Sequence, residues 1–290
     1  MIRVAAFIAA VLLLLVLLGA RSADPGVSDP IRLAWLARVG ASQADAADEA
    51  LVLAEDVMVE GTDHAREGMT AILSGDTDPA VPLAQAAASF ESAAPLVDAA
   101  QASLTALRWT LLALDPNAAV PELTIQQADI LAISAQWLAA APPSAALADL
   151  RRQAEGTVTL LGDALASLDA DDPEAALVSL DEAEAALEPL RDQADRMPAL
   201  GVWIDTVDAL ITAMRDIALA AQAGDQAALT EAQAAYEAAA ADAARADQAL
   251  TIAIGESAAQ IVRPASASSA VALRAVSATR DELAALSILR

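Results

Sequence analysis

Apolar side chains recur every three or four residues along most of the chain, the period that places them on one face of an α-helix. The clearest stripe consists of Trp203, Val207, Leu210, Met214, Ile217 and Ala221. Similar stripes run through residues 147–168 and 176–194. No stretch alternates between apolar and polar positions over the length of a strand, so we expect no β-sheet.

Short stretches of proline, glycine and aspartate separate these stripes. In Asp172-Pro173-Glu174 a capping side chain precedes a proline whose missing N–H costs nothing in the first helical turn. Pro95 and Pro189 lie inside two stripes, where we expect a kink or a split. The boundaries predict helices near residues 30–73, 80–114, 122–141, 144–168, 173–195, 199–222, 226–262 and 268–288.

The connections between these helices are short, so consecutive helices should be antiparallel neighbours. We therefore expect an all-α fold in which antiparallel helical hairpins form one or more bundles or a short α-solenoid. A single hydrophobic helix at the N-terminus should precede it. No repeat of fixed length with signature positions is present, and the choice between bundle and solenoid stays open.

The N-terminus predicts export from the cytoplasm. Met1–Arg3 precedes an uncharged apolar run from Val4 to Ala20, longer than a usual signal-peptide core and slightly short for a membrane span. Arg3 before the run and an acidic chain after it place the rest outside the cytoplasm, in the periplasm or at the cell surface. Residues 4–20 either stay in the cytoplasmic membrane as an anchor or are removed near Ser22, which would make the protein secreted.

These features divide the chain into three parts. Residues 1–23 are a signal anchor or signal peptide, 24–263 an extracytoplasmic helical domain, and 264–290 a linker with a C-terminal amphipathic helix. The Ser/Ala-rich stretch Pro264–Ser269 is the expected linker. No cysteine stands at the end of the apolar run, which excludes a lipid anchor there.

The composition limits how the core can be built. Hydrophobic residues make up 57% of the chain but aromatic residues only 2%, so Leu, Val, Ile and Ala must fill the core. We expect the four tryptophans, Trp35, Trp109, Trp137 and Trp203, to be its rare large side chains. Trp35 is the exception: it follows the apolar run closely, and indole rings favour the lipid boundary.

The charge of the chain excludes nucleic acid as a partner. It has 41 acidic residues against 16 basic ones, all arginine, for a net charge of −25. Nucleic-acid binding needs Lys and Arg to replace the counterions of phosphates, and this surface would repel them. Arginine without lysine reflects either a GC-rich genome or, together with the acidity, a high-salt habitat.

Reactive side chains are scarce. The chain has one histidine, one tyrosine, no cysteine and no lysine, so a catalytic triad would depend on His64 alone. No serine lies between two glycines in a nucleophile elbow. Catalysis by paired carboxylates would need a cleft with two inward-facing acids. We therefore expect no enzyme and no cofactor.

Two clusters of acidic residues resemble metal sites, but neither is expected to be one. Glu60, Asp63, His64 and Glu67 have helical spacing, yet the acids fall opposite the apolar stripe of their helix, and ligands in bundles project inward. In a second cluster, Asp169, Asp171, Asp172 and Glu174, Pro173 interrupts the pattern and Leu180 stands where an EF-hand needs its closing glutamate. We interpret the first as a solvated face and the second as helix capping.

The sequence thus predicts no catalytic, cofactor-binding or metal-binding residue. The function that fits is a non-enzymatic, membrane-anchored extracytoplasmic helical protein acting through contacts with another protein or with itself. The alternative is a receptor-like or sensor-like domain that binds a small molecule or cation between helices. A pocket lined by His64, Trp109 or Trp137 would favour the receptor, and a continuous exposed apolar stripe would favour the contact protein.

Overall fold

The computed structural model describes residues 30–286, which are mostly helical, as predicted, with no strand among them. Residues 115–126 form a non-helical connection, so the helix expected from residue 122 begins at Gln127. The predicted N-terminal hydrophobic helix lies outside the described residues. The helices are α2 (Pro30–Ser74), α3 (Ala80–Leu114), α4 (Gln127–Asp169), α5 (Pro173–Ala194), α6 (Pro198–Ala223) and α7 (Gln226–Ala284).

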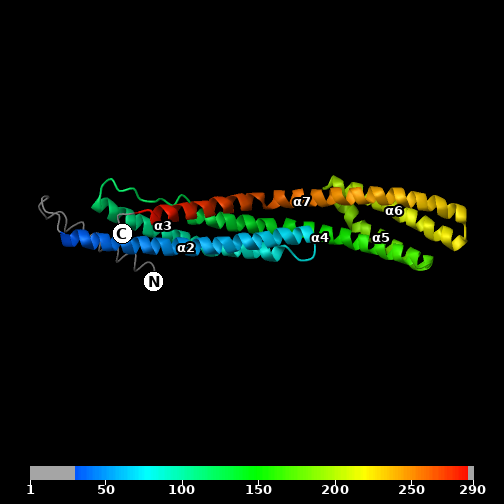
Figure 1. Ribbon diagram of the computed structural model, residues 1–290, viewed down its shortest axis with the longest axis horizontal. Coiled ribbons are helices and arrows are strands. Elements are labelled where there is room, and N and C mark those ends of the chain that lie inside the picture. Colours follow the sequence, from blue (N-terminus) through cyan, green and yellow to red (C-terminus); the bar gives the residue numbers. More distant parts are fainter. Residues whose placement is uncertain (1–29, 287–290) are drawn as a thin grey trace.

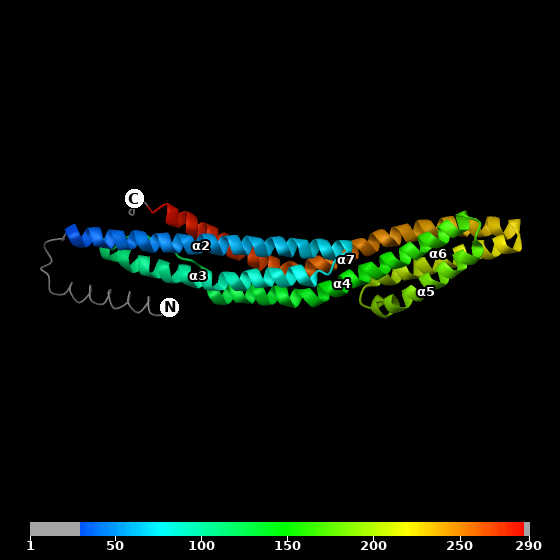
Figure 2. The ribbon, with the colours of Figure 1, turned by 90° about the horizontal axis from the view of Figure 1, so that it is seen from below.

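The helices pack side by side into a long rod (Figure 1). Helices α4 and α7 extend along both halves of the rod; α2 and α3 lie beside them in one half, and α5 and α6 in the other. The start of α2 and the end of α7 lie near the same end, which we call the proximal end (Figures 1 and 2). At 1.5 Å per residue, the 59 residues of α7 alone measure about 88 Å.

Each half of the rod has its own apolar core. The proximal core is formed by α2, α3, the first part of α4 and the last part of α7, and contains Phe90 and Trp137. The distal core is formed by the second part of α4, by α5 and α6, by residues 246–258 in the middle of α7, and by Ile72 near the end of α2, and it contains Trp203. Alanine and leucine supply much of both cores, as the composition predicts.

The turn between α2 and α3 joins the two halves. Gly75 ends α2 with a φ of +71°, a conformation that glycine adopts without steric cost, and its carbonyl accepts a hydrogen bond of 3.1 Å from Arg152 Nε of α4. Arg151 Nη1 donates to Thr251 Oγ1 of α7 at 3.1 Å. The turn between α2 and α3 is thereby attached to α4, and the neighbouring residue of α4 is bonded to α7.

Several helix breaks predicted from proline are wrong. Pro142 and Pro143 lie inside α4, so the expected helices 122–141 and 144–168 are one. Pro264 lies inside α7, which replaces the expected helices 226–262 and 268–288. Pro95 and Pro189 also lie inside continuous helices, and neither splits its helix.

Exposure to solvent explains why these helices tolerate proline. A proline inside a helix removes the hydrogen bond to the carbonyl four residues earlier. The prolines are all at exposed positions, and so are the residues that lose their partner: Glu91, Leu138, Ala139, Ala185 and Gln260. Water can satisfy those carbonyls, and the apolar face of each helix stays packed.

The expected linker Pro264–Ser269 is therefore helix, and the C-terminal segment completes the proximal core. Ala265, Ala272 and Val276 are buried there. The indole Nε1 of Trp137 donates to Ser269 Oγ at 3.1 Å, linking α4 to α7. On the surface, Arg280 Nη1 donates to Glu55 Oε2 of α2 at 2.9 Å, and this hydrogen bond raises the pKa of the guanidinium.

Two glycines allow α2 and α3 to approach closely. A Cβ at Gly61 would lie 3.0 Å from Phe90 Cε2 and 3.1 Å from Ser89 Cβ. A Cβ at Gly68 would lie 2.7 Å from Leu83 Cδ2. Phe90 and Leu83 are fully buried, so neither has free space to move into. The glycines are therefore part of the helix contact.

Alanine substitutions at a packed glycine and at an open glycine should distinguish the cost of overpacking from the gain in helix propensity. We expect Gly61→Ala to destabilise the protein by about 1–2 kcal/mol, because overpacking outweighs the gain of about 1 kcal/mol in propensity. Gly162→Ala in α4, with nothing within 4 Å of the added methyl, should stabilise it by about 0.5–1 kcal/mol. Thermal and denaturant unfolding of the full chain measure both. A higher unfolding midpoint for Gly61→Ala would contradict the packing argument.

Candidate functional site

The cluster around His64 lies on the solvent side of α2. His64 Nδ1 is 3.5 Å from Glu67 Oε2, and His64 Nε2 is 3.8 Å from Glu60 Oε1. The glutamate side chains are 66% and 69% exposed, and Asp63 pairs instead with Arg66 at 2.6 Å. The acids face solvent, as the helical geometry predicts. No group of potential ligands within residues 30–286 has the arrangement of a metal site.

The second acidic cluster caps a helix. Asp172 precedes α5, and its Oδ1 accepts a hydrogen bond of 3.1 Å from the backbone N–H of Ala175. Asp171 forms the turn after α4 with a φ of +61°, a left-handed conformation that aspartate tolerates better than most residues. This arrangement confirms the interpretation as helix capping.

The tryptophans divide into two groups. Trp137 and Trp203 are 1% exposed and belong to the proximal and distal cores. Trp109 is 60% exposed, so the expectation that it fills the core is wrong. Leu107 and Leu111 on either side of it are buried, and residues two positions away point to the opposite face of a helix. Trp35 is also exposed, at 44%.

Buried polar side chains are few and uncharged. Within the described range they are serines and threonines: Thr110, Ser134, Ser144, Thr157, Ser269 and Thr279. No charged residue of this range is buried as a whole, although the Nε atom of Arg151 is, and it lies 2.6 Å from Glu155 Oε1. Enzymes usually shift the pKa of acid and base groups by burying them, and this part of the chain offers no such group.

Two grooves flank the small-residue segment of α7 that the sequence suggested as a linker. The larger, of about 530 Å³, lies between α4 and α7 and contains Asp129, Gln136 and Ser268 in its lining. Asp129 Oδ2 accepts a hydrogen bond of 2.8 Å from the Gln126 N–H at the start of α4. The one carboxylate in this groove therefore serves as a helix cap and has no second acid beside it.

The smaller groove, of about 300 Å³, lies between α2 and α7 above Trp137. Arg66 and Met69 of α2 and Ser266 of α7 contribute to its lining. Its surface is mainly apolar, with one guanidinium at the edge. Trp137 thus lines a groove, whereas His64 and Trp109 do not line either groove. The sequence indicated this place only as a run of alanine and serine.

Exposed apolar side chains are distributed over the described helices. On α4 they form two pairs seven residues apart, Leu131 with Leu138 and Val158 with Leu165, and the two pairs lie on opposite sides of the helix. No single stripe continues along the described part of the rod. The large exposed residues include Leu33, Leu53, Leu73, Val81, Leu131, Leu138, Val158, Leu165, Val178, Val202, Leu219, Ile252 and Val271. The described residues thus lack the continuous exposed stripe that would favour the contact protein, and carry separate apolar patches instead.

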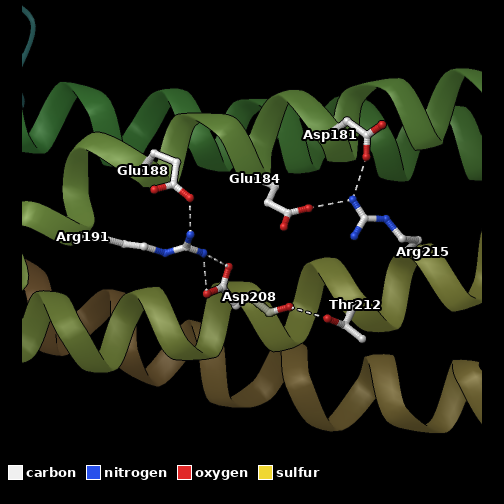
Figure 3. A network of polar contacts seen from close by, with 7 residues as sticks. All are labelled: Asp181, Glu184, Glu188, Arg191, Asp208, Thr212 and Arg215. Carbon is white, nitrogen blue, oxygen red and sulfur yellow. Dashed lines mark hydrogen bonds and ion pairs between the residues drawn. The ribbon is translucent and has the colours of Figure 1, made fainter.

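An ion-pair network connects α5 to α6 on the distal half (Figure 3). Arg191 Nη2 donates to both carboxylate oxygens of Asp208 at 2.9 Å, and its Nη1 contacts Glu188 at 2.5 Å. Arg215 bridges Asp181 at 2.7 Å and Glu184 at 2.9 Å. Hydrogen bonds to these carboxylates raise the pKa of both arginines. Glu188 is three residues from Arg191, but no sequence pattern reveals the partner on the other helix.

The network should hold the α5–α6 hairpin closed. We expect Asp208→Asn to lower the melting temperature of the full chain, because it removes a bidentate partner of Arg191. Asp205→Asn removes the same charge from the same helix at an exposed position outside the network, and should have less effect. The difference should shrink in molar salt, which screens exposed charges. Equal melting temperatures for the two variants at low salt would contradict this role.

One described helix is apolar and long enough to be compared with a membrane span. Helix α4 contains an 18-residue window with a mean hydropathy of 1.3. Its apolar residues line both cores, from Ile130 and Trp137 in the proximal half to Leu161 in the distal half. Of the residues in that apolar window, 39% are buried inside the rod.

Comparisons with protein-family models, with curated proteins and with solved structures gave no match for this chain.

Proposed function

We propose that this chain is a non-enzymatic helical rod, exported and anchored in the cytoplasmic membrane by residues 4–20, that works through contacts with another protein or with a second copy. In this proposal, antiparallel helical hairpins project from the N-terminal hydrophobic helix into the extracytoplasmic space. The function would be to present binding surfaces at a distance from the membrane.

The position of the chain ends carries this proposal. Helix α2 begins at the proximal end, nine residues after the apolar run Val4–Ala20. The turn between α6 and α7 lies at the opposite end of the rod. An anchor at residues 4–20 would therefore hold one end at the membrane and leave the other about 88 Å away, the length of α7 at 1.5 Å per residue.

The distal end is suited to contact because little of it is used for packing. The stretch of α7 from Gln226 to Arg245 lies wholly within the described residues, and in it only Ala232 is buried. The rest of that stretch is alanine-rich and exposed or half-buried. Between Asp149 and Glu256 the sequence has 22 acidic residues and 6 arginines, so a partner there would be basic.

The proposal of a non-enzymatic role rests on which reactive side chains are present and where they lie. The sequence has no cysteine or lysine and one histidine, and within the described residues no carboxylate is buried. Of the two grooves, one contains a capping aspartate and the other a paired arginine. Neither groove has two carboxylates facing one another.

Membrane attachment and contact formation can be tested on the tagged full chain in its native cells. We expect the chain in the membrane fraction, accessible to protease added outside the cytoplasmic membrane, and crosslinked into larger species. Replacing Leu14 and Leu15 by arginine should release it from the membrane, since charges at a span centre cost about 2.5–3.5 kcal/mol each. A monomer in the cytoplasm without crosslinked species would refute the proposal.

A second candidate function is binding of a small molecule in the α2–α7 groove. It is favoured by the mainly apolar lining of this groove, which includes Met69, Trp137 and Leu273 and suits a small apolar molecule. Arg66 at the groove is already paired with Asp63. The groove would then make the rod a receptor-like domain whose ligand bridges α2 and α7.

Anilinonaphthalene sulfonate, an apolar anion, is a suitable probe for this groove. We expect saturable fluorescence enhancement with the folded chain, lost in Ser266→Leu, which fills the α2–α7 groove. Ser268→Leu is the matched control, because Ser268 lies in the α4–α7 groove. Binding that is unchanged in Ser266→Leu, or lost equally in both variants, would refute this site.

A further inference from the structure

The first two turns of α2 extend beyond the end of their partner helix. Gln43 Oε1 of α2 accepts a hydrogen bond of 2.8 Å from Thr110 Oγ1 of α3, which fixes the register of these antiparallel helices. Leu114, the last residue of α3, is four residues further along and is therefore level with Val39. Residues 30–38 of α2 project past it at the proximal end (Figure 1).

This projecting segment exposes large apolar side chains. Leu33 is 40% exposed and Trp35 is 44% exposed. Leu33 precedes the buried Leu36 and Ala47 by 3 and 14 residues, so it has the orientation of a core residue. It is exposed because α3 has ended and no described helix covers it.

Arginines flank these apolar residues. Arg32 and Arg38 are both exposed, and neither forms an ion pair with another residue of the described range. In the sequence, Asp29 lies three residues before Arg32, and the next acidic residue is Asp45. A patch of Leu and Trp between unpaired arginines is thus found at one end of a chain with a net charge of −25.

The chain preceding α2 limits what can cover this patch. Nine residues separate Ala20, the last residue of the apolar run, from Pro30, so the two are at most about 36 Å apart when this segment is fully extended. If residues 4–20 are in the bilayer, the patch lies within that distance of its surface. Indole rings concentrate at the headgroup level, and arginines pair there with lipid phosphates.

We propose that Arg32, Leu33, Trp35 and Arg38 insert into the headgroup layer of the membrane that holds residues 4–20. This inference rests on the proposed anchor and adds a second attachment that sets the orientation of the rod. The acidic body is repelled by anionic lipids while the arginines at its base are attracted. The rod therefore stands away from the surface on its proximal end.

Tryptophan quenching by brominated lipid tests this contact. The full chain is reconstituted into vesicles of phosphatidylcholine and phosphatidylglycerol in which the phosphatidylcholine has bromines near the top of its acyl chains. Trp35 should be quenched, so the Trp35→Phe variant should lose the bilayer-dependent quenching. Trp137 and Trp203 are 1% exposed and contribute a background that bromine does not reach.

Trp109→Phe is the matched control. Trp109 is more exposed than Trp35, but it lies further from the proximal end. Its neighbour Thr110 contacts Gln43, which is eight residues, or about 12 Å along α2, beyond Trp35. Quenching should persist in Trp109→Phe. If Trp109→Phe loses the quenching and Trp35→Phe retains it, the rod lies along the membrane and the proposal is wrong.

Flotation of the same vesicles separates the two proposals. A chain that does not float with vesicles lacks the anchor, which overturns the proposed function together with this inference. A chain that floats but shows no bromine quenching keeps the anchor and overturns only the basal contact. Arg32→Gln with Arg38→Gln should weaken quenching in vesicles containing phosphatidylglycerol more than in vesicles of phosphatidylcholine alone.

Discussion

The continuity of α4 and α7 is the constraint on which the rest of this structure depends. Each of these helices passes from the proximal core into the distal core without a break. The two halves are each built mainly from four helices, and α4 and α7 belong to both. The α2–α3 and α5–α6 hairpins complete the cores from opposite ends (Figure 2). The hydrogen bond from Trp137 to Ser269 ties the two helices together in the proximal core.

An alanine-rich composition determines how such a core can be stable. Burial of an alanine methyl contributes far less than burial of a leucine, at about 0.8 kcal/mol per methylene-sized group. Close approach of the helices compensates, because more backbone and Cβ atoms come into van der Waals contact. Gly61 and Gly68 extend this principle to the contact between α2 and α3, where even a methyl group would meet Phe90 or Leu83. The few large side chains, with Phe90, Trp137 and Trp203 foremost, occupy the centres of the cores.

The proposed anchored rod and its basal membrane contact both follow from a shape in which the start of α2 and the end of α7 lie near the proximal end. Attachment at the proximal end would give the distal surface reach, and the exposed base of α2 would give the rod a direction relative to the bilayer. The grooves beside α7 are a consequence of its small side chains, since Ser266 and Ser268 fill little of the space between helices. The same segment thus allows close packing at Ala265 and leaves open surface on either side.

The sequence alone determined the helical class, several helix boundaries and the outward orientation of the acids beside His64, because these depend on local periodicity and capping. Helix α3 begins and ends at the residues predicted. Only the tertiary structure decided that α4 and α7 continue through Pro142, Pro143 and Pro264, since that depends on which face each proline occupies once the cores are packed. It also decided that Trp109 faces solvent, and that Arg191 meets Asp208 on another helix. Local patterns set what each segment becomes, whereas pairing between distant segments sets which of its faces is buried.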